Sequence, residues 1–409
     1  MFTAFWILNL ICVGITFSSL QMALAKEDMK LSAVAHGCRA FSSSFHKTVA
    51  HTAKGNIVNS PLSTHIVLSY LFQGSGGSTA EEMIASLHLA HTKQLHMEYK
   101  DLISILDSLD KVELILANGL FLSEDLNLHD AFQTKGTDFY NFSVENVNFA
   151  DKIGAAKLIN EWVSKNTKNK IKDIMSSDDI NEYMKVVLVN AIYFKGQWQH
   201  QFNANVTEKR VFHTSQISNK QVPTMYKEFK YSHGDIPSLK SRFLEIPYMD
   251  PNLEMIIVLP HEIEGLIFVE ENFDWNAVVN AESSKRVTRL YLPKFKVEAT
   301  IDLKTVLHEI GFKSMFEDTA DFSEMSAVPL KVDSVVQKAF LEVNEFGSEA
   351  AAATVVRMMM KRSLEIMDEP EEFVVDRPFI VAIRHVPSNI PLFIASVRDI
   401  NVTPEKDEL

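Results

Sequence analysis

The segment from Glu345 to Arg362, EFGSEAAAATVVRMMMKR, sets the strongest constraint on what this chain can fold into. It begins with small side chains, continues through β-branched residues and ends in a basic cluster. Small side chains enter a sheet at little steric cost, and β-branched residues favour strands. A helical alanine run on a solvated loop is the competing interpretation, because alanine is also the best helix former. The basic end would offer positive charge to acidic subsites of a protease.

The residues around this segment resemble the hinge of the serpins, protease inhibitors whose reactive loop inserts into their own central sheet. The hinge match, LEVNEFGSEAAAAT, covers residues 341–354. Six further segments on either side of the hinge also match, in the family's order: NIVNSPLS (56–63), GGSTAEEM (76–83), VLVNAIYFKGQW (187–198), LYLPKFKVE (290–298), DRPF (376–379) and PLFIASV (391–397). The resemblance implies one serpin domain over residues 26–409, with the hinge and reactive loop at 345–371. It also implies an α+β fold with three β-sheets, roughly nine helices and an exposed reactive-centre loop.

The periodicity of the chain agrees with the α+β class. Helical patterns cover residues 31–51, 60–71, 79–87 and 151–169, and Ser78 or Thr79 is the expected cap of the third helix. Strand patterns cover residues 113–122, 185–194, 242–248, 253–259, 287–299, 332–343, 372–375, 379–385 and 391–397. Helices therefore dominate the first third of the chain and strands the last third.

The serpin resemblance gives a role to the small residues. The hinge that would insert consists of Glu345, Gly347, Ser348, Ala350, Ala351, Ala352, Ala353 and Thr354. Side chains of an inserted strand alternate into the sheet interior, so charge or bulk in the hinge would slow insertion. Among these residues Ser348, Ala350, Ala352 and Thr354 are compatible with fast insertion.

The resemblance also identifies polar residues beneath the strands that must part. Ser60, Ser63 and Asn190 align with the family's shutter, a hydrogen-bonded cluster, although the two serines could also be simple helix caps. Gln337 stands where the family usually has a histidine, and its amide cannot titrate near neutral pH.

Two further residues are placed by the resemblance near the hinge. Trp198 would lie at the breach, where the loop first enters the sheet, and Lys294 would pair with Glu345. Either could equally be an ordinary core or surface residue.

Two bonds compete as the reactive bond. The family's usual spacing of about sixteen residues after Glu345 ends at Lys361 and predicts cleavage between Lys361 and Arg362. The pattern of Arg357, Lys361 and Arg362 instead resembles a site for furin-like proprotein convertases and favours Arg362–Ser363. Met359 departs from the commonest convertase motif, so Arg357 would have to substitute for a closer arginine.

The expected partner is therefore a serine endopeptidase of the furin-like class. A trypsin-like protease is the closest alternative, because it needs only one basic residue before the bond. A non-inhibitory luminal chaperone of serpin fold is the second alternative, and the intact small-residue hinge argues against it. We expect the chain to act as a monomer.

Both ends of the chain indicate the secretory pathway. Residues 1–25 carry no charge, are apolar from Phe5 to Phe17 and end in a small-x-small site, which predicts a signal peptide. A membrane anchor is the alternative, but the apolar run is shorter than a span needs. The last residues, Lys406, Asp407, Glu408 and Leu409, form a retrieval signal of the endoplasmic reticulum lumen, read by a receptor. We expect luminal retention with a fraction secreted, and glycosylation at Asn141, Asn205 and Asn401.

Other chemistry finds little support in the sequence. The net charge of −13 argues against nucleic acid as a partner. Residues 74–77 and 35–38 superficially resemble segments of trypsin-like enzymes, but they lack the required acidic neighbour and strand context, so we expect no catalysis. His88, His91 and His96 match no closed metal pattern, and neither a metal nor a cofactor is expected. Cys38, the one cysteine after the leader, lies on an apolar stripe and predicts a buried, inert thiol.

Overall fold

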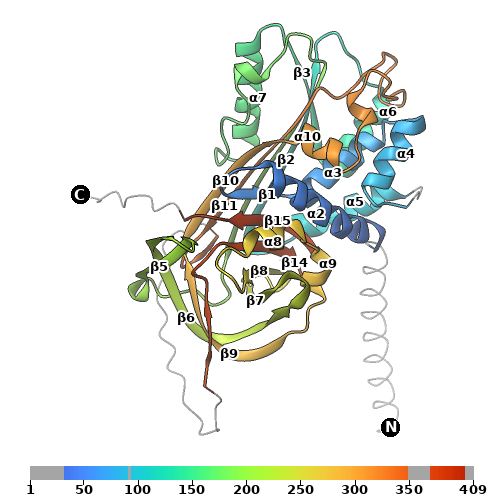
Figure 1. The fold of residues 1–409 in the computed structure, drawn as a ribbon. Coiled ribbons are helices and arrows are strands. Elements are labelled where there is room, and N and C mark those ends of the chain that lie inside the picture. Colours follow the sequence, from blue (N-terminus) through green and yellow to red (C-terminus); the bar gives the residue numbers. More distant parts are fainter. Residues whose placement is uncertain (1–31, 91–93, 349–368, 401–409) are drawn as a thin grey trace, which may run out of the picture.

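The computed structural model describes residues 32–90, 94–348 and 369–400 (Figure 1). Nine α-helices lie in this part of the chain. They are α2 (Ser32–Thr52), α3 (Pro61–Phe72), α4 (Gly77–Ser86), α5 (Leu95–Asp107), α6 (Asp130–Tyr140), α7 (Lys152–Asn166), α8 (Leu266–Glu271), α9 (Trp275–Val279) and α10 (Leu303–Glu309). The described ranges contain no helix that is long and apolar enough to cross a membrane.

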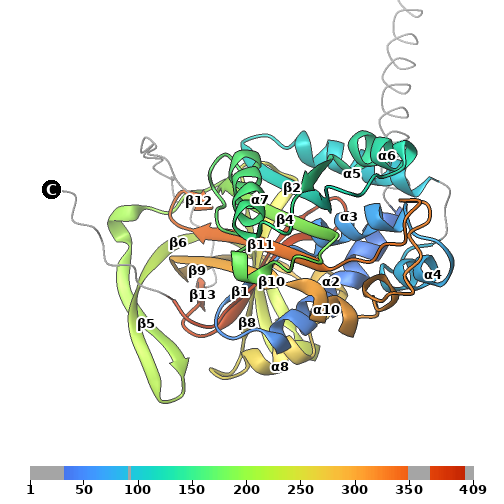
Figure 2. The same cartoon turned by 90° about the horizontal axis from the view of Figure 1, so that it is seen from above.

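The central sheet runs through the middle of the molecule (Figure 2). Its strand order is β10 (Phe295–Asp302), β11 (Ser334–Val343), β4 (Val186–Gln197), β2 (Val112–Ser123) and β3 (Phe142–Val147). A two-residue strand, β12 (Gly347–Ser348), also pairs with β4. Most of β4 and the second half of β2 are buried and largely apolar, as expected for strands that are covered on both faces.

The remaining strands form one nine-stranded network. Its order is β1 (Ile57–Asn59), β15 (Ile390–Val397), β14 (Phe379–His385), β8 (Leu253–Pro260), β7 (Ser241–Pro247), β6 (Ser218–Ile236), β9 (Ser284–Pro293) and β13 (Glu371–Val374), with β5 (Glu208–Ser215) on β6. The long strand β6 joins two parts of this network, because its end pairs with β7 and its middle with β9. The predicted α+β fold with three sheets and about nine helices is confirmed, and two of the sheets are continuous through β6.

The two faces of the central sheet are covered differently. Because side chains alternate along a strand, one face of β2 and β4 presents Phe121, Val187 and Val189 to helix α7. The other face packs into the main core together with α2, α3 and β15. Helix α7 therefore lies alone across one side of the sheet (Figure 2).

Two local predictions were wrong. Helix α4 is preceded by Gly76, which makes no side-chain cap, and the hydroxyl of Thr79 instead accepts a hydrogen bond from the Asp321 backbone N–H at 3.0 Å. The predicted strand 287–299 is two strands in different sheets, β9 and β10, which meet at Lys294. Pro293 has no N–H for the ladder, which is consistent with a break there.

Cys38 is fully buried in α2, and burial raises the pKa of its thiol, as expected for an inert cysteine. No metal-holding group of three His, Cys, Asp or Glu side chains occurs among the described residues, and His91 lies outside them.

Candidate functional site

The hinge begins as the second arm of a tight hairpin that follows β11. The Asn344 N–H donates to the Gly347 carbonyl at 2.9 Å, and the chain reverses over Glu345 and Phe346. β12 then pairs antiparallel with the C-terminal end of β4, with Ser348 opposite Gly196. Toward their N-terminal ends β4 and β11 pair directly with each other in parallel, from Ser334↔Val187 to Phe340↔Tyr193. A strand that continued β12 between β4 and β11 would be antiparallel to both.

Gly347 occupies a position that only glycine fits. Its φ is +148°, and a Cβ there would lie 2.0 Å from the Gly196 carbonyl oxygen. The next side chain, Ser348, is fully buried, and its hydroxyl lies 2.9 Å from the Tyr248 hydroxyl. The small residues that suit insertion are therefore also required by the native packing of β12.

Trp198 lies directly beneath the hinge turn. The indole is fully buried and stacks on Tyr248 with 4.7 Å between ring centroids. Its Nε1 donates to the Asn344 carbonyl at 2.9 Å, and its backbone N–H donates to the Phe346 carbonyl at 3.0 Å. The structure thus brings Trp198 to the point where the hinge meets the sheet, and we call this group, Trp198 with Tyr248 and residues 344–348, the breach.

Glu345 is anchored at this breach by two side chains. Lys294 Nζ lies 3.1 Å from Glu345 Oε2, and the Thr207 hydroxyl donates to Oε1 at 2.8 Å. The Glu345 side chain is only 6% exposed, whereas that of Lys294 is 41% exposed. Water screens such a half-exposed cation, so the ion pair contributes modestly, and the Thr207 hydrogen bond supplies a second partner for the buried carboxylate.

Nearer the N-terminal ends of β4 and β11, polar residues form a row across three strands. Asn118 of β2 is opposite Asn190 of β4, which is opposite Gln337 of β11. The Asn190 amide donates to Asn118 Oδ1 at 2.6 Å and to the Ser63 hydroxyl, and Gln337 Nε2 donates to Asn190 Oδ1 at 2.7 Å. All of these side chains are buried.

The start of α3 closes this row from below. Gln337 Oε1 accepts from the Ser60 N–H at 2.8 Å, and its Nε2 reaches the Ser60 carbonyl at 3.0 Å and the Thr64 hydroxyl at 2.8 Å. The Ser60 hydroxyl also accepts from the Ser63 N–H as a helix cap and donates to the Leu392 carbonyl at 2.6 Å. Ser60 is thus both a cap and a member of the cluster. We call Ser60, Ser63, Thr64, Asn118, Asn190 and Gln337 the shutter.

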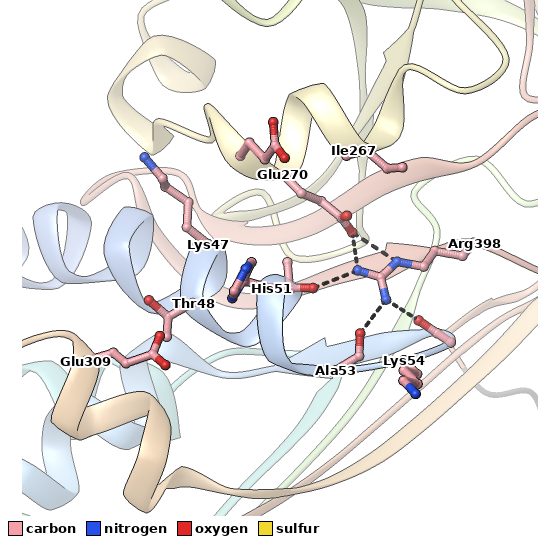
Figure 3. A pocket seen from close by; sticks show the side chains of 12 residues that line it. Lys47, Thr48, His51, Ala53, Lys54, Ile267, Glu270, Glu309 and Arg398 are labelled. Atoms are coloured by element: carbon pink, nitrogen blue, oxygen red, sulfur yellow. Dashed lines mark hydrogen bonds and ion pairs between the residues drawn. The ribbon is translucent and has the colours of Figure 1, made fainter.

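A separate cavity of about 700 Å³ lies between α2, α8 and α10 (Figure 3). Its most basic group, Arg398, donates to Glu270 Oε1 from Nε at 3.2 Å and from Nη2 at 2.9 Å. The guanidinium also donates to the carbonyls of Ala50, Ala53 and Gly55 at the end of α2. Because its donors are used in this way, Arg398 holds the end of β15 to two helices and is not available to bind an anion.

Several predicted residues lie outside the described part of the chain. These are Ala350 to Thr354, Arg357, Lys361, Arg362, Ser363, Asn401 and the tail Lys406 to Leu409. Asn141 and Asn205 are described, and both are exposed.

Sequence reasoning missed five residues that complete the two clusters, Thr64, Asn118, Thr207, Tyr248 and Asn344. Asn118 gave a usable signal, because it is a polar residue inside an otherwise apolar strand pattern. Thr207 and Tyr248 gave none, since their partners lie 138 and 100 residues away in the chain.

Comparison with known proteins agrees with this architecture. The serpin family, described as serine protease inhibitor, matches residues 36–400, and the chain belongs to it. Leukocyte elastase inhibitor of Xenopus laevis is 36% identical over 360 residues, which cover 85% of this chain and 94% of the relative. Alaserpin of Manduca sexta is 34% identical over 355 residues, covering 85% and 89% respectively.

Solved structures give the same result. A serpin of Tenebrio molitor, Serpin48, matches with a TM-score of 0.84 and 32% identity over 90% of this chain and 99% of that one. A cleaved form of Serpin 42Da matches with a TM-score of 0.79 and 30% identity, over 90% of this chain and 98% of that one.

Proposed function

We propose that this chain is a suicide-substrate inhibitor of serine endopeptidases. Inhibitory relatives support protease inhibition in general. The observation that carries the proposal for this chain is the hinge, whose residues Gly347 and Ser348 already pair with β4 in the orientation of an inserted strand. A non-inhibitory luminal chaperone of serpin fold is the alternative, and the small hinge residues from Gly347 to Thr354, which suit insertion into a sheet, argue against it.

The geometry supports trapping of an acyl-enzyme. The protease serine attacks the scissile carbonyl, the peptide bond breaks, and the new C-terminus stays esterified to the protease. Cleavage frees the hinge from residues 369–400, which remain in the nine-stranded network. The hinge then continues from β12 between β4 and β11 and carries the protease with it before water can hydrolyse the ester.

The basic cluster favours furin-like convertases as the target. Arg362 would precede the cleaved bond to Ser363, and Arg357 with Lys361 would meet further acidic subsites. A signal peptide and a retrieval signal would place the inhibitor in the pathway where convertases mature. A trypsin-like target remains the second candidate, because one basic residue suffices for it.

The experiment that tests the target uses Arg357→Ala. Removing a second charge-assisted contact should cost roughly 1–3 kcal/mol of binding and slow furin trapping, while trypsin trapping stays nearly unchanged. Denaturation-resistant complexes are quantified with each protease, and the released C-terminal peptide is sequenced by mass spectrometry. Arg362→Ala serves as the positive control, because it should abolish both activities.

The cleavage position decides between the two reactive bonds. A released fragment that starts at Ser363 supports the convertase assignment. Unchanged furin kinetics of Arg357→Ala, together with a fragment that starts at Arg362, would leave a trypsin-like protease as the target. Absence of any stable complex with either protease would contradict the inhibitor proposal itself.

Retention in the endoplasmic reticulum is tested by deleting residues 406–409. The truncated chain should move from the cells into the medium, because the receptor no longer retrieves it. Its trapping of protease in vitro should equal that of the full chain, since the deletion leaves the hinge and the reactive loop unchanged. Equal secretion with and without the tail would contradict retention.

A further inference from the structure

The sequon Asn141-Phe142-Ser143 lies beside a tryptophan of helix α7. Asn141 ends α6 in the left-handed conformation, with φ +50°, and the chain then enters β3. Phe142 points into the main core, so the alternation of a strand directs Ser143 to the opposite face, which α7 covers. Ser143 is opposite Gly119 of β2. A Cβ on Gly119 would lie 2.9 Å from the Trp162 ring, which places that ring on the same face.

A cavity of about 320 Å³ opens at this position. Residues of α5, β2, the junction of α6 with β3 and the end of α7 line it, among them Tyr140, Asn141, Ser143, Trp162, Asn166 and Lys168. The volume is at the lower end of the range for small-ligand sites, roughly 300–1,000 Å³, so it suits one ring better than a branched chain. Trp162 is the partly exposed aromatic side chain of this lining, whereas Tyr140 is fully buried. An indole face with a polar rim suits a pyranose ring, because the C–H face of the ring stacks on the indole while its hydroxyls reach the rim.

We propose that Asn141 carries an N-linked glycan whose first sugar occupies this cavity and stacks on Trp162. The proposal rests on the secretory-pathway placement proposed above and is independent of the protease target. The seated sugar would connect the end of α6 and the edge strand β3 to the last turn of α7. Asn205 offers a matched comparison, because it is an exposed sequon on a short helical turn (Ala204–Val206) away from this cavity.

We call the position of this sugar against Trp162 its seat. Tryptophan fluorescence can measure whether the seat is occupied. Trp198 and Trp275 are fully buried, whereas Trp162 is partly exposed. The fourth tryptophan, Trp6, falls in the expected signal peptide. A quencher in the solvent therefore reports mainly on Trp162.

The test compares three forms of the native protein produced in a secretory host. One keeps its full glycans, one is trimmed by an endoglycosidase to a single sugar on each asparagine, and one is stripped by an amidase. Acrylamide quenching of tryptophan fluorescence should be equal for the full and trimmed forms. The stripped form should show stronger quenching and emission at longer wavelength, because Trp162 has lost its cover.

Variants separate this seat from general effects of glycosylation. Asn141→Gln and Ser143→Ala each remove the same glycan and should both resemble the stripped protein, so the result does not depend on one substitution folding well. Asn205→Gln should still respond to stripping, and Trp162→Phe should lose the response. Peptide mass spectrometry measures occupancy in every sample.

The outcomes distinguish this proposal from the others. A chain with no glycan on Asn141 or Asn205 would overturn it together with the secretory-pathway placement. Glycan on Asn205 alone, or equal quenching of the trimmed and stripped forms, would overturn the Asn141 seat and leave that placement and protease inhibition intact.

Discussion

The seam between β4 and β11 has an upper half at the C-terminal ends of the two strands and a lower half at their N-terminal ends. The strands have different partners in the two halves. In the lower half β11 pairs directly with β4, down to Ser334↔Val187. Above Phe340↔Tyr193 the two strands part: β11 continues on β10 alone, and β12 takes the edge of β4. In the native state the breach is therefore already parted and holds the first residues of an inserting strand, whereas the shutter half is closed.

The two halves also differ in how their polar groups are satisfied. At the breach Asn344 and the hinge residue Ser348 supply the partners of Trp198 and Tyr248. At the shutter the amides of Asn190 and Gln337 bond across the seam, and a strand entering between β4 and β11 must separate them. Backbone ladder bonds can be exchanged for bonds to the incoming strand, but buried amides left without partners cost about 1–3 kcal/mol each. Strand entry therefore begins freely at the breach and meets its resistance at the shutter.

Ser348→Arg should have the largest effect, because it prevents the hinge from entering the breach half of the seam. Ser348 is fully buried between β4 and Tyr248, and a guanidinium there would need burial without a partner. The hinge should then leave the edge of β4, and the inhibitor should become a substrate that is cleaved without trapping. The ratio of cleaved inhibitor to denaturation-resistant complex measures this change.

Ser348→Ala is the control for this prediction. It keeps the small volume and loses only the contact with the Tyr248 hydroxyl, a change of about 0.5–1.5 kcal/mol in the free energy of unfolding, so trapping should persist. Efficient trapping by Ser348→Arg would show that the breach geometry is not used for insertion.

Asn190→Ala should weaken the contact between β4 and β11 in the shutter half of the seam and should lower the stability of the protein. The change leaves Asn118, Ser63 and Gln337 each without one buried partner, and we expect a loss of about 3 kcal/mol in the free energy of unfolding. It should also speed the uptake of a synthetic peptide with the hinge sequence, because strand addition to an open sheet gives peptide affinity. Urea unfolding and peptide uptake followed by native electrophoresis measure the two effects.

Asn160→Ala is a matched control away from the seam. Asn160 makes three hydrogen bonds to the backbone of Ile174 and Met175 beside α7. Its loss should lower stability comparably without speeding peptide uptake. Equal uptake by the two variants would mean that the shutter is not the barrier.

The same contrast separates what the sequence could predict from what it could not. Gly347 and Ser348 were identified because small residues before a basic cluster are a local signal, whereas Ser60 was assigned to the shutter through the family resemblance, with helix capping as the alternative. The Asn190–Gln337 pair was reached only through the family resemblance, since it joins strands 147 residues apart in the chain. Such long-range partners depend on register, which short-range patterns do not determine.

Strand β6 shows the same limit for the fold. Its sequence, SNKQVPTMYKEFKYSHGDI, carries six Lys, Glu, Asp or His side chains and a proline, and no strand was predicted there. It is a strand because three others, β5, β7 and β9, pair with it directly and the core lies beneath them.

Gln337→His should have the smallest effect at neutral pH, and its pH dependence tests whether the shutter controls strand entry. A neutral imidazole can accept from the Ser60 N–H and donate to one further group, so it replaces part of what the Gln337 amide does. At pH 7.5 the free energy of unfolding should change by no more than about 1 kcal/mol.

The effect should grow as the pH falls, because a buried histidine resists protonation. Burial already lowers the pKa of His46 to about 3 and those of His65 and His385 to about 4. A histidine at position 337 should behave in the same way, while in the unfolded chain it titrates near pH 6.5. The unfolded state then binds more protons below pH 6.5, so stability that is present above this pH is lost as the pH falls toward the folded pKa.

Between pH 7.5 and 5.5, Gln337→His should lose about 1.4 kcal/mol more than the parent chain, since one pH unit below the unfolded pKa corresponds to that energy. The parent also loses stability in this window through His46, His65 and His385, so the two curves of unfolding free energy against pH must be subtracted. Peptide uptake by the variant should accelerate over the same interval, whereas that of the parent should change less, because Gln337 cannot titrate. Parallel stability curves, or uptake that stays equal for both proteins at pH 5.5, would show that position 337 does not control the closed half of the seam.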